Sequence, residues 1–264
     1  MAQSATPQAH AFAAALAAIA HTDRLLVALD FDGTVSAIVD RPGAARVLPE
    51  AVGAIEKLEA LPRTWVAYVS GRPLDSLASV TEADPDALLI GSHGAEVRLD
   101  GGTVELSLSD DERNRLAELD AVLTELVNAN PGAMLERKPV GLGVHSRLMD
   151  QRGVPALHAA ARSAAKQIGG FLERGGKDIL EFAVRDATKG DGVDVLRSRV
   201  GATAVLYAGD DVTDEDAFAR MREGDLGVKV GEGETAAGFR VADPKAVAVM
   251  LGLLAGARAN AVGS

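Results

Sequence analysis

The stretch Leu25-Leu26-Val27-Ala28-Leu29-Asp30-Phe31-Asp32-Gly33-Thr34 opens with five apolar residues and then brings two carboxylates and a glycine. An unbroken apolar run of this length is typical of a strand that is buried on both faces, as in a parallel sheet. Where the chain is still extended, Asp30 and Asp32 point the same way, and Gly33 permits a tight turn after them. The stretch therefore predicts a buried strand that delivers two carboxylates to one edge of a sheet.

Four further apolar runs each end in Gly, Asp or Ser: Trp65–Val69, Leu88–Ile90, Ala204–Ala208 and Leu226–Val230. Between the first strand and the second, Pro49 is followed by apolar residues at helical spacing, which predicts a β-α-β unit. A second alternation of helix and strand surrounds 204–208. The fold class that we expect is α/β, with a Rossmann-like parallel-sheet core.

The middle of the chain has a different pattern. The segment 103–108 leads into a helix with leucines at positions 116, 119, 123 and 126, and an Ala-rich helix is predicted over Val154–Ile168. Three further strands are predicted over Met134–Lys138, Leu142–Arg147 and Asp178–Val184. Helices segregated from adjacent strands predict an α+β cap inserted into the core. The expected domains are a first part of the core over 1–103, the cap over 104–183 and a second part of the core over 184–264.

Composition excludes several classes of function. The 264 residues are 47% hydrophobic and 25% charged, with a net charge of -11 and no cysteine. The acidic balance argues against a nucleic-acid binder, and a phosphate substrate would need local cations. Without cysteine, the chain has no disulfide, no thiolate metal site and no thiol chemistry, and a cytoplasmic location is the simple default.

The Ala-rich segment Phe12–Ala20 has no Lys or Arg before it, so it reads as a helix that packs on the core and not as a signal peptide. No apolar run approaches the roughly 20 residues needed to cross a bilayer. We therefore expect no membrane contact. The sequence gives no sign of an obligate protein partner.

Asp30 and Asp32 suggest a first piece of chemistry. Two carboxylates at this spacing can share a hard cation, and one can act as nucleophile while the other transfers protons. Taken alone, Asp-x-Asp-Gly is about as readily a simple turn in which Asp32 bonds its own backbone. The pattern becomes specific only together with partners.

Two cationic groups stand at comparable positions. In Ser70-Gly71-Arg72-Pro73, directly after the second strand, a hydroxyl, a backbone N–H and a guanidinium suit phosphate oxygens, although a capped turn explains the same residues. Lys189, before a core helix, would lower the pKa of Asp30 and neutralise phosphate charge. A lone Lys before Gly is otherwise a solvated loop residue.

The fourth group, after Asp30/Asp32, Ser70–Pro73 and Lys189, is Gly209-Asp210-Asp211-Val212-Thr213-Asp214. It follows the strand at 204–208. Asp210 would complete a Mg²⁺ site, while Thr213 caps the next helix and Glu215 and Asp216 occupy its first turn. Four complementary groups thus follow strand ends, and ligands of open α/β sheets bind at that edge. Their conjunction predicts one active site.

These motifs together resemble the haloacid dehalogenase (HAD) superfamily of phosphatases, over essentially the whole chain after residue 24. The resemblance implies that Asp30 forms an aspartyl-phosphate and that Asp32 is the general acid and base. It implies Mg²⁺ ligation by Asp30, the Asp32 carbonyl and Asp210, with Asp214 as an alternative ligand. It further implies that Ser70, Gly71 and Lys189 hold the phosphate.

The inserted region, together with its flanking loops, indicates a particular family within this superfamily. Together with Ser70–Pro73, four stretches are similar to trehalose-6-phosphate phosphatases: Gly91-Ser92-His93-Gly94-Ala95-Glu96, Glu136-Arg137-Lys138, Val144-His145-Ser146-Arg147 and Gly176-Lys177-Asp178-Ile179-Leu180-Glu181. Ser146 departs from the aromatic residue that is common there. The similarity implies hydrolysis of trehalose 6-phosphate, a small sugar phosphate. The residues that it implies for substrate contact are Arg72, Glu136, Lys138 and Glu181. His93 is a further candidate for substrate contact, with support of the loop as the alternative.

Other functions stay open on the sequence. A related capped phosphatase would act on sucrose 6-phosphate or mannosyl-3-phosphoglycerate, and a phosphomutase would move a phosphate without releasing it. A non-catalytic sugar-phosphate sensor would keep the fold but lose turnover. The intact Asp30, Asp32, Lys189 and Asp210 argue against the sensor.

Overall fold

The structure is a computed structural model that describes residues 7–39, 41–99, 102, 104–106, 108–176 and 178–263. One compact unit consists of the residues up to Glu105 together with those from Thr188 onward, and the second unit is Leu106–Ala187. Of the residues in the sequence motifs, Gly101, Thr103 and Lys177 lie outside the described part.

The first unit is built on an eight-stranded sheet whose order is β12-β11-β10-β1-β2-β3-β4-β5. Neighbouring strands from β12 to β3 are parallel, and β4 is antiparallel to β3. The strands are β1 (Leu25–Asp30), β2 (Thr64–Val69), β3 (Leu88–Gly91), β4 (Glu96–Arg98), β5 (Val104–Leu106), β10 (Ala204–Gly209), β11 (Leu226–Val230) and β12 (Phe239–Val241). The prediction of an α/β fold with a parallel-sheet core is confirmed.

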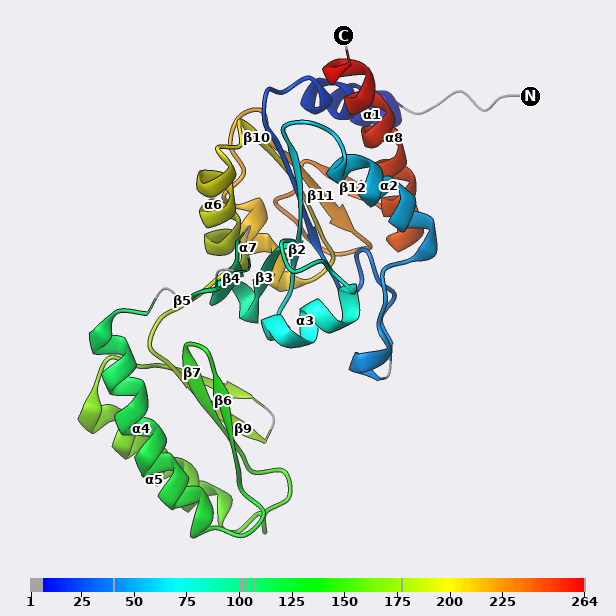
Figure 1. Ribbon diagram of the computed structural model, residues 1–264. Helices are drawn as coiled ribbons and strands as arrows, with labels where there is room; N and C mark the ends of the chain where they lie inside the picture. Colours follow the sequence, from blue (N-terminus) through cyan, green and yellow to red (C-terminus); the bar gives the residue numbers. More distant parts are fainter. Residues whose placement is uncertain are drawn as a thin grey trace. The chain divides into compact units, whose positions relative to one another are not determined.

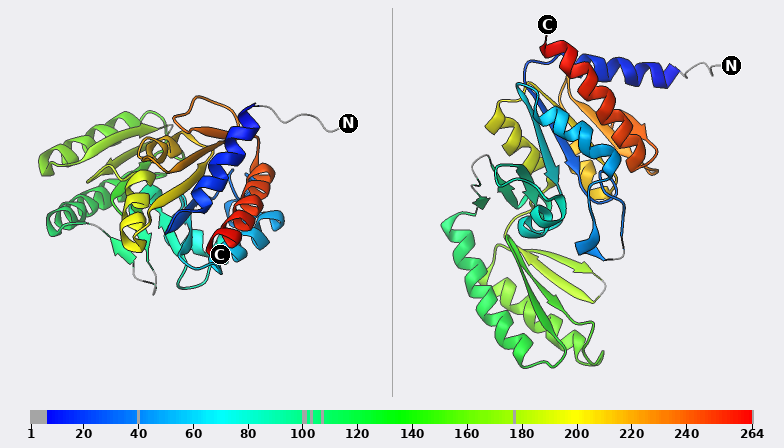
Figure 2. Two further views of the ribbon diagram at one scale, coloured as in Figure 1. Left: turned by 90° about the horizontal axis from the view of Figure 1, so that it is seen from above. Right: turned by 45° about the vertical axis from the view of Figure 1, so that its right-hand side comes forward.

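Helices cover both faces of this sheet (Figure 1, Figure 2). One face carries α1 (Pro7–Ala20), α2 (Pro49–Glu59), α3 (Leu74–Thr81) and α8 (Pro244–Val262), and the other carries α6 (Lys189–Val200) and the short α7 (Glu215–Phe218). Val27 and Leu29 of β1 pack on the first face, while Leu26 and Ala28 pack on the second. This division follows from the alternation of side chains along a strand, and it explains why β1 has to be apolar throughout.

Helix α8 has 19 residues and is, among the described helices, the one long and apolar enough by length and composition to cross a bilayer. The expectation that no segment approaches this length is wrong in that respect. Leu251 and Leu254 are nevertheless buried in the same cluster as α1 and α2. The buried Arg258 guanidinium donates to the carbonyl oxygens of Ala20 and Arg63, at 2.9 and 3.0 Å. These contacts make α8 a core helix of the first unit.

The second unit is a four-stranded antiparallel sheet, in the order β6-β7-β9-β8, with two helices packed side by side on one face (Figure 1). Its elements are α4 (Asp110–Asn128), β6 (Met134–Lys138), β7 (Gly141–His145), α5 (Val154–Ile168), β8 (Leu172–Gly176) and β9 (Ile179–Ala183). Leu142 and Val144 of β7 are buried against Leu119 and Leu123 of α4. Strand β8, Leu-Glu-Arg-Gly-Gly, escaped prediction because it holds a single apolar residue.

Candidate active site

Three adjacent strands deliver polar residues to one edge of the large sheet. Asp30 ends β1, Ser70 follows β2 and Asp210 follows β10, and β2 and β10 lie on the two sides of β1. Open α/β sheets bind ligands at such a point, where the chain order changes direction. A cavity of about 730 Å³ lies there. Its lining includes every site residue predicted in this unit apart from Asp214: Asp30, Asp32, Ser70, Gly71, Arg72, His93, Lys189 and Asp210.

Lys189 is the buried cation of this site. It is the first residue of α6, behind the N-cap Thr188, whose hydroxyl accepts a hydrogen bond from the Asp191 backbone N–H. The Lys189 Nζ donates to Asp30 Oδ1 at 2.6 Å and to Asp214 Oδ1 at 2.8 Å. Burial opposes the charged form, but the two carboxylates outweigh it and raise the pKa of Lys189. Lys189 is therefore a fixed positive charge beside Asp30.

Negative charge nevertheless remains in excess around Asp30. Burial raises the pKa of the Asp30 carboxyl well above its usual range, Lys189 counteracts this in part, and Asp214 adds to it. The pKa of Asp210 is also raised, by burial and by Asp214. The sequence predicted a lower pKa for Asp30 beside Lys189, and this contribution is present, but burial exceeds it.

The excess charge fits a divalent cation. Ligand atoms of Asp30, Asp210 and Asp214 lie within 4.8 Å of one another, the only such group among the described residues. Three carboxylates against the ammonium groups of Lys189 and the nearby buried Lys229 leave a formal charge of −1, and oxygen ligands suit a hard cation. In addition, the buried Thr213 Oγ1 lines the same cavity and bonds no described residue. The donor set is that of a metal site, with Asp214 inside the cluster.

Asp32 is held apart from this cluster by Arg72. Arg72 Nε donates to Asp32 Oδ2 and Arg72 Nη2 to Asp32 Oδ1, each at 2.6 Å, while Nη1 donates to the Pro42 carbonyl oxygen at 2.9 Å. The hydrogen bonds that Arg72 donates to Asp32 raise the pKa of Arg72. Both carboxylate oxygens of Asp32 are therefore engaged by Arg72, and Asp32 is not a member of the three-carboxylate group.

The loop after β2 is folded against His93. Ser70 is buried, its hydroxyl accepts from the Arg72 backbone N–H at 3.1 Å, and its carbonyl accepts from the His93 N–H at 3.1 Å. A Cβ on Gly71 would lie 2.5 Å from His93 Cε1 and Nε2. A larger residue at position 71 would therefore displace the His93 ring from the loop.

Two residues that hold the acidic cluster escaped the sequence analysis. Tyr207 in β10 donates its hydroxyl to Asp214 Oδ1 at 2.6 Å, and burial with Asp214 raises the pKa of Tyr207 well above its usual range. Lys229 in β11 is buried and donates to the carbonyl oxygens of Asp210 and Val230. The available signal was a single polar or charged residue inside an otherwise apolar run.

The helical cap after Asp210 differs from the prediction. The side chain of Asp211 accepts from the Val212 N–H at 2.7 Å at the start of a short 3₁₀ helix, Val212–Asp214. Thr213 is therefore not the capping residue, and its hydroxyl stays unbonded among the described residues. Glu215 and Asp216 do occupy the first turn of α7, as predicted.

The predicted residues of the second unit form a cluster of their own. Lys138 pairs with Glu181, and its Nζ lies 3.7 Å from Glu136 Oε2. His145 Nε2 lies 2.9 Å from the same oxygen of Glu136. In the sheet, Glu136 and Glu181 are both in register with Gly143 of β7, so strand pairing brings them onto one face. Arg147 lies 3.9 Å from Asp178 and is not part of this cluster.

Comparison with known proteins agrees with this geometry. The trehalose-phosphatase family model matches residues 28–245. A trehalose-phosphate phosphatase of Mycobacterium avium is 35% identical over 83% of this chain and 59% of its own length. An uncharacterised glycosyl hydrolase of Mycobacterium tuberculosis is 35% identical over 88% of this chain. The crystal structure of Aspergillus fumigatus trehalose-6-phosphate phosphatase is 25% identical with a TM-score of 0.69, covering 92% of this chain and 97% of that one.

The chain spans only 18% and 59% of these two curated relatives, so the match concerns part of each. The range that the family model matches, 28–245, includes Asp30, Lys189 and Asp210 as well as the cluster of the second unit. On the family match and the fold, the chain belongs to the trehalose-phosphatase family.

Proposed function

We propose that the chain is a Mg²⁺-dependent phosphatase that hydrolyses trehalose 6-phosphate to trehalose and phosphate. The observation that carries this proposal is the position of Asp30 at the carboxyl end of β1, hydrogen-bonded to Lys189 within a carboxylate cluster that lines a cavity. The family match and the names of the relatives support the substrate.

The metal-binding groups in this proposal are Asp30, Asp210 and the backbone carbonyl of Asp32, with Asp214 as an alternative ligand. When bound, Mg²⁺ supplies positive charge that neutralises the phosphate and offsets the raised pKa values of the cluster. Lys189 supplies a further fixed positive charge beside Asp30, and the Lys229 ammonium donates a hydrogen bond to the Asp210 carbonyl oxygen.

In the first step, an Asp30 carboxylate oxygen attacks phosphorus and the bond from phosphorus to the sugar oxygen breaks. Asp32 gives a proton to the leaving sugar oxygen, so that trehalose departs as a neutral alcohol. Lys189 occupies Asp30 Oδ1, which leaves Oδ2 as the attacking atom. Asp30 then carries an acyl phosphate.

In the second step, Asp32 takes a proton from water, and the water oxygen attacks phosphorus. The bond to Asp30 breaks, which releases phosphate and restores both aspartates. Proton transfer requires that Asp32 be released from its two hydrogen bonds with Arg72. In our proposal Arg72 turns to the substrate when it binds, and this frees Asp32 for acid and base catalysis.

Ser70, Gly71 and Lys189 bind the phosphate, through a hydroxyl, a backbone N–H and an ammonium. Arg72 and His93 contact the sugar from the first unit. Glu136, Lys138 and Glu181 contact it from the second, whose role is that of a cap. Carboxylates and an ammonium suit sugar hydroxyls, which both donate and accept hydrogen bonds.

Phosphate release from a panel of sugar phosphates, with Mg²⁺ and with chelator, tests this function. We expect the highest kcat/KM for trehalose 6-phosphate and no turnover under chelation. Faster hydrolysis of sucrose 6-phosphate or mannosyl-3-phosphoglycerate would show a related sugar phosphatase. Isomerisation of a hexose phosphate without net release would show a mutase, and binding without turnover would show a sensor.

A further inference from the structure

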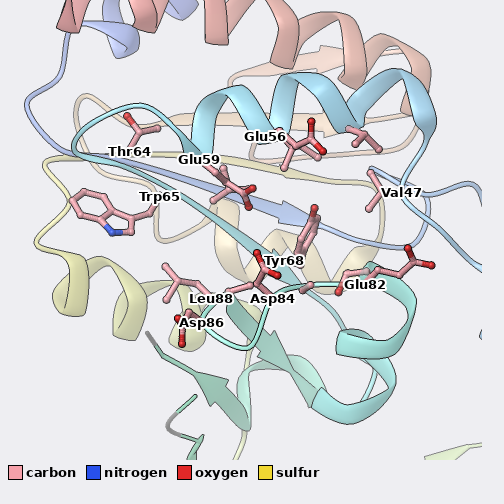
Figure 3. Close-up of a pocket in the computed structure, with 16 residues that line it drawn as sticks. Val47, Glu56, Glu59, Thr64, Trp65, Tyr68, Glu82, Asp84, Asp86 and Leu88 are labelled. Carbon is pink, nitrogen blue, oxygen red and sulfur yellow. The ribbon is translucent and has the colours of Figure 1, made fainter. Parts of the chain in front are cut away.

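The first unit holds a second cavity, of about 450 Å³, lined by α2, β2 and the connection from α3 to β3. It shares no lining residue with the catalytic cavity. Figure 3 shows its side chains, with Glu56 and Glu59 from α2, Tyr68 from β2 and Asp84 from the connection. Small-molecule pockets have volumes of roughly 300–1,000 Å³, so the cavity has the size of a binding site.

Five carboxylates line this cavity: Glu56, Glu59, Glu82, Asp84 and Asp86. Glu82 is paired with Arg46 at 3.0 Å, whereas within the described residues no Lys, Arg or His side chain forms an ion pair with Glu56, Glu59 or Asp84. Burial raises the pKa of Glu59, and Asp84 and Glu56 raise it further. The cavity therefore carries negative charge that the described protein groups do not balance.

Tyr68 gives an independent indication of a ligand. Its side chain lines the cavity and keeps only 7% of its accessible surface, yet its hydroxyl makes no hydrogen bond with any described residue. The hydroxyl oxygen is the accessible tip of this otherwise buried side chain, since it is not one of the fully buried polar atoms without a partner. The ring itself is fixed edge-on against Phe31, with centroids 6.3 Å apart. The free group is thus held rigidly where a ligand can reach it.

The arrangement of the carboxylates decides the class of ligand. A metal ion needs several oxygens converging on one point, and in the described part of the chain the only three-carboxylate group of that kind is Asp30, Asp210 and Asp214. The acidic side chains of the second cavity are instead spread around apolar walls that include Ile55 and Val66. Spaced charges with apolar surface between them match a cation that has several charged ends joined by methylene groups.

We propose that this cavity binds a linear aliphatic polyamine. Its ammonium groups pair with Glu56, Glu59 and Asp84, and one of them donates to the Tyr68 hydroxyl oxygen. Its methylene chain lies against Ile55 and Val66. This site is separate from the phosphatase site. Binding of the polyamine there does not depend on hydrolysis of a sugar phosphate.

Spermidine is the probe, titrated by calorimetry at low ionic strength in the presence of saturating Mg²⁺, which occupies the Asp30 cluster. We expect one saturable site. The double variant Glu59→Gln/Asp84→Asn should bind about tenfold more weakly, because it removes two of the three carboxylates that pair with the ammonium groups. Tyr68→Phe, which keeps the ring, should also weaken binding. Glu50→Gln, on α2 but outside the cavity, is the matched control.

Undiminished binding to Glu59→Gln/Asp84→Asn would overturn the proposal, because spermidine would then occupy another acidic surface. Absence of any saturable binding to the wild-type protein would overturn it as well. Spermidine binding to the wild-type protein and to the double variant is measured without a sugar phosphate. The outcome is therefore independent of whether the protein has the proposed phosphatase activity.

Discussion

Both carboxylate oxygens of Asp32 accept a hydrogen bond from Arg72, each 2.6 Å long, so that the proposed acid and base is held by a residue that also faces the cavity. A planar guanidinium can form this double contact, and a lysine ammonium cannot. In the mechanism that we propose, this pair links substrate binding to the release of Asp32.

Arg72→Lys keeps the charge but removes the second hydrogen bond. We expect kcat/KM for trehalose 6-phosphate to fall by about 10- to 100-fold, because a lysine cannot reproduce the contact with the substrate that we propose for the guanidinium, and a hydrogen bond that involves a charged group contributes about 1.5–3 kcal/mol. Steady-state phosphate release measures the effect. Arg152→Lys, whose side chain is 91% exposed and pairs with Asp150, is the control. Equal kcat/KM for Arg72→Lys and wild type would exclude this role for Arg72.

Lys189→Met removes the cation between Asp30 and Asp214. Loss of one partner of a buried ion pair leaves uncompensated charge, so the free energy of unfolding should fall by about 3–5 kcal/mol in chelator, and turnover should be lost. Urea unfolding measures the first and phosphate release the second. Lys166→Met, at an exposed position of α5, is the control. A Lys189→Met protein as stable as wild type would show that Lys189 does not hold this cluster.

Gly33→Ala tests the close packing around Asp210. Gly33 has φ +82°, and a Cβ there would lie 2.1 Å from Asp210 Oδ2. We expect a loss of at least about 1–3 kcal/mol in stability and a higher Mg²⁺ concentration for half-maximal activity. Gly53→Ala, in α2 with no atom within 4 Å of its Cβ position, should instead stabilise the protein by about 0.5–1 kcal/mol. Equal effects of the two substitutions would refute the steric explanation.

Glu112 and Arg185 predict a pH dependence in the second unit. Hydrogen bonds from Arg185, together with one from the Ser109 backbone N–H, lower the pKa of Glu112 from 4.5 to about 2 in the folded state. The stabilisation is therefore complete above pH 4.5 and is lost as the pH falls from there towards 2. Glu112→Gln should lower Tm at pH 6 and have a shrinking effect at lower pH.

Thermal unfolding from pH 6 to 2.5 measures this difference. Glu118→Gln, exposed on the same helix, is the control and should show no such trend. A Glu112→Gln effect on Tm that is constant across the range would show that the ion pair with Arg185 does not contribute as described.

Much of the core was predictable because buried parallel strands leave an unmistakable apolar run, and because Asp30, Ser70 and Asp210 each follow one. Adjacency of those strands then brings the residues together without further information. The position of Lys189 beside Asp30 followed from the same reasoning and is confirmed as a contact at 2.6 Å.

What escaped prediction depends on packing between distant segments. Lys229 sits in β11, and only the register with β10 shows that it reaches the Asp210 carbonyl. The approach of Glu59 to Asp84 requires the packing of α2 against the loop after α3, for which no local pattern exists. The Arg72 contact with Asp32 likewise joins two loops 40 residues apart.

The central claim is that Asp30 attacks the phosphorus of trehalose 6-phosphate. Rapid acid quenching during turnover with Mg²⁺, followed by peptide mass spectrometry, tests it most directly, alongside phosphate release by Asp30→Asn. We predict a phosphoryl group on Asp30 in the wild type, and for Asp30→Asn a folded protein without turnover. A phosphoryl group on another residue, or undiminished turnover by Asp30→Asn, would contradict the assignment.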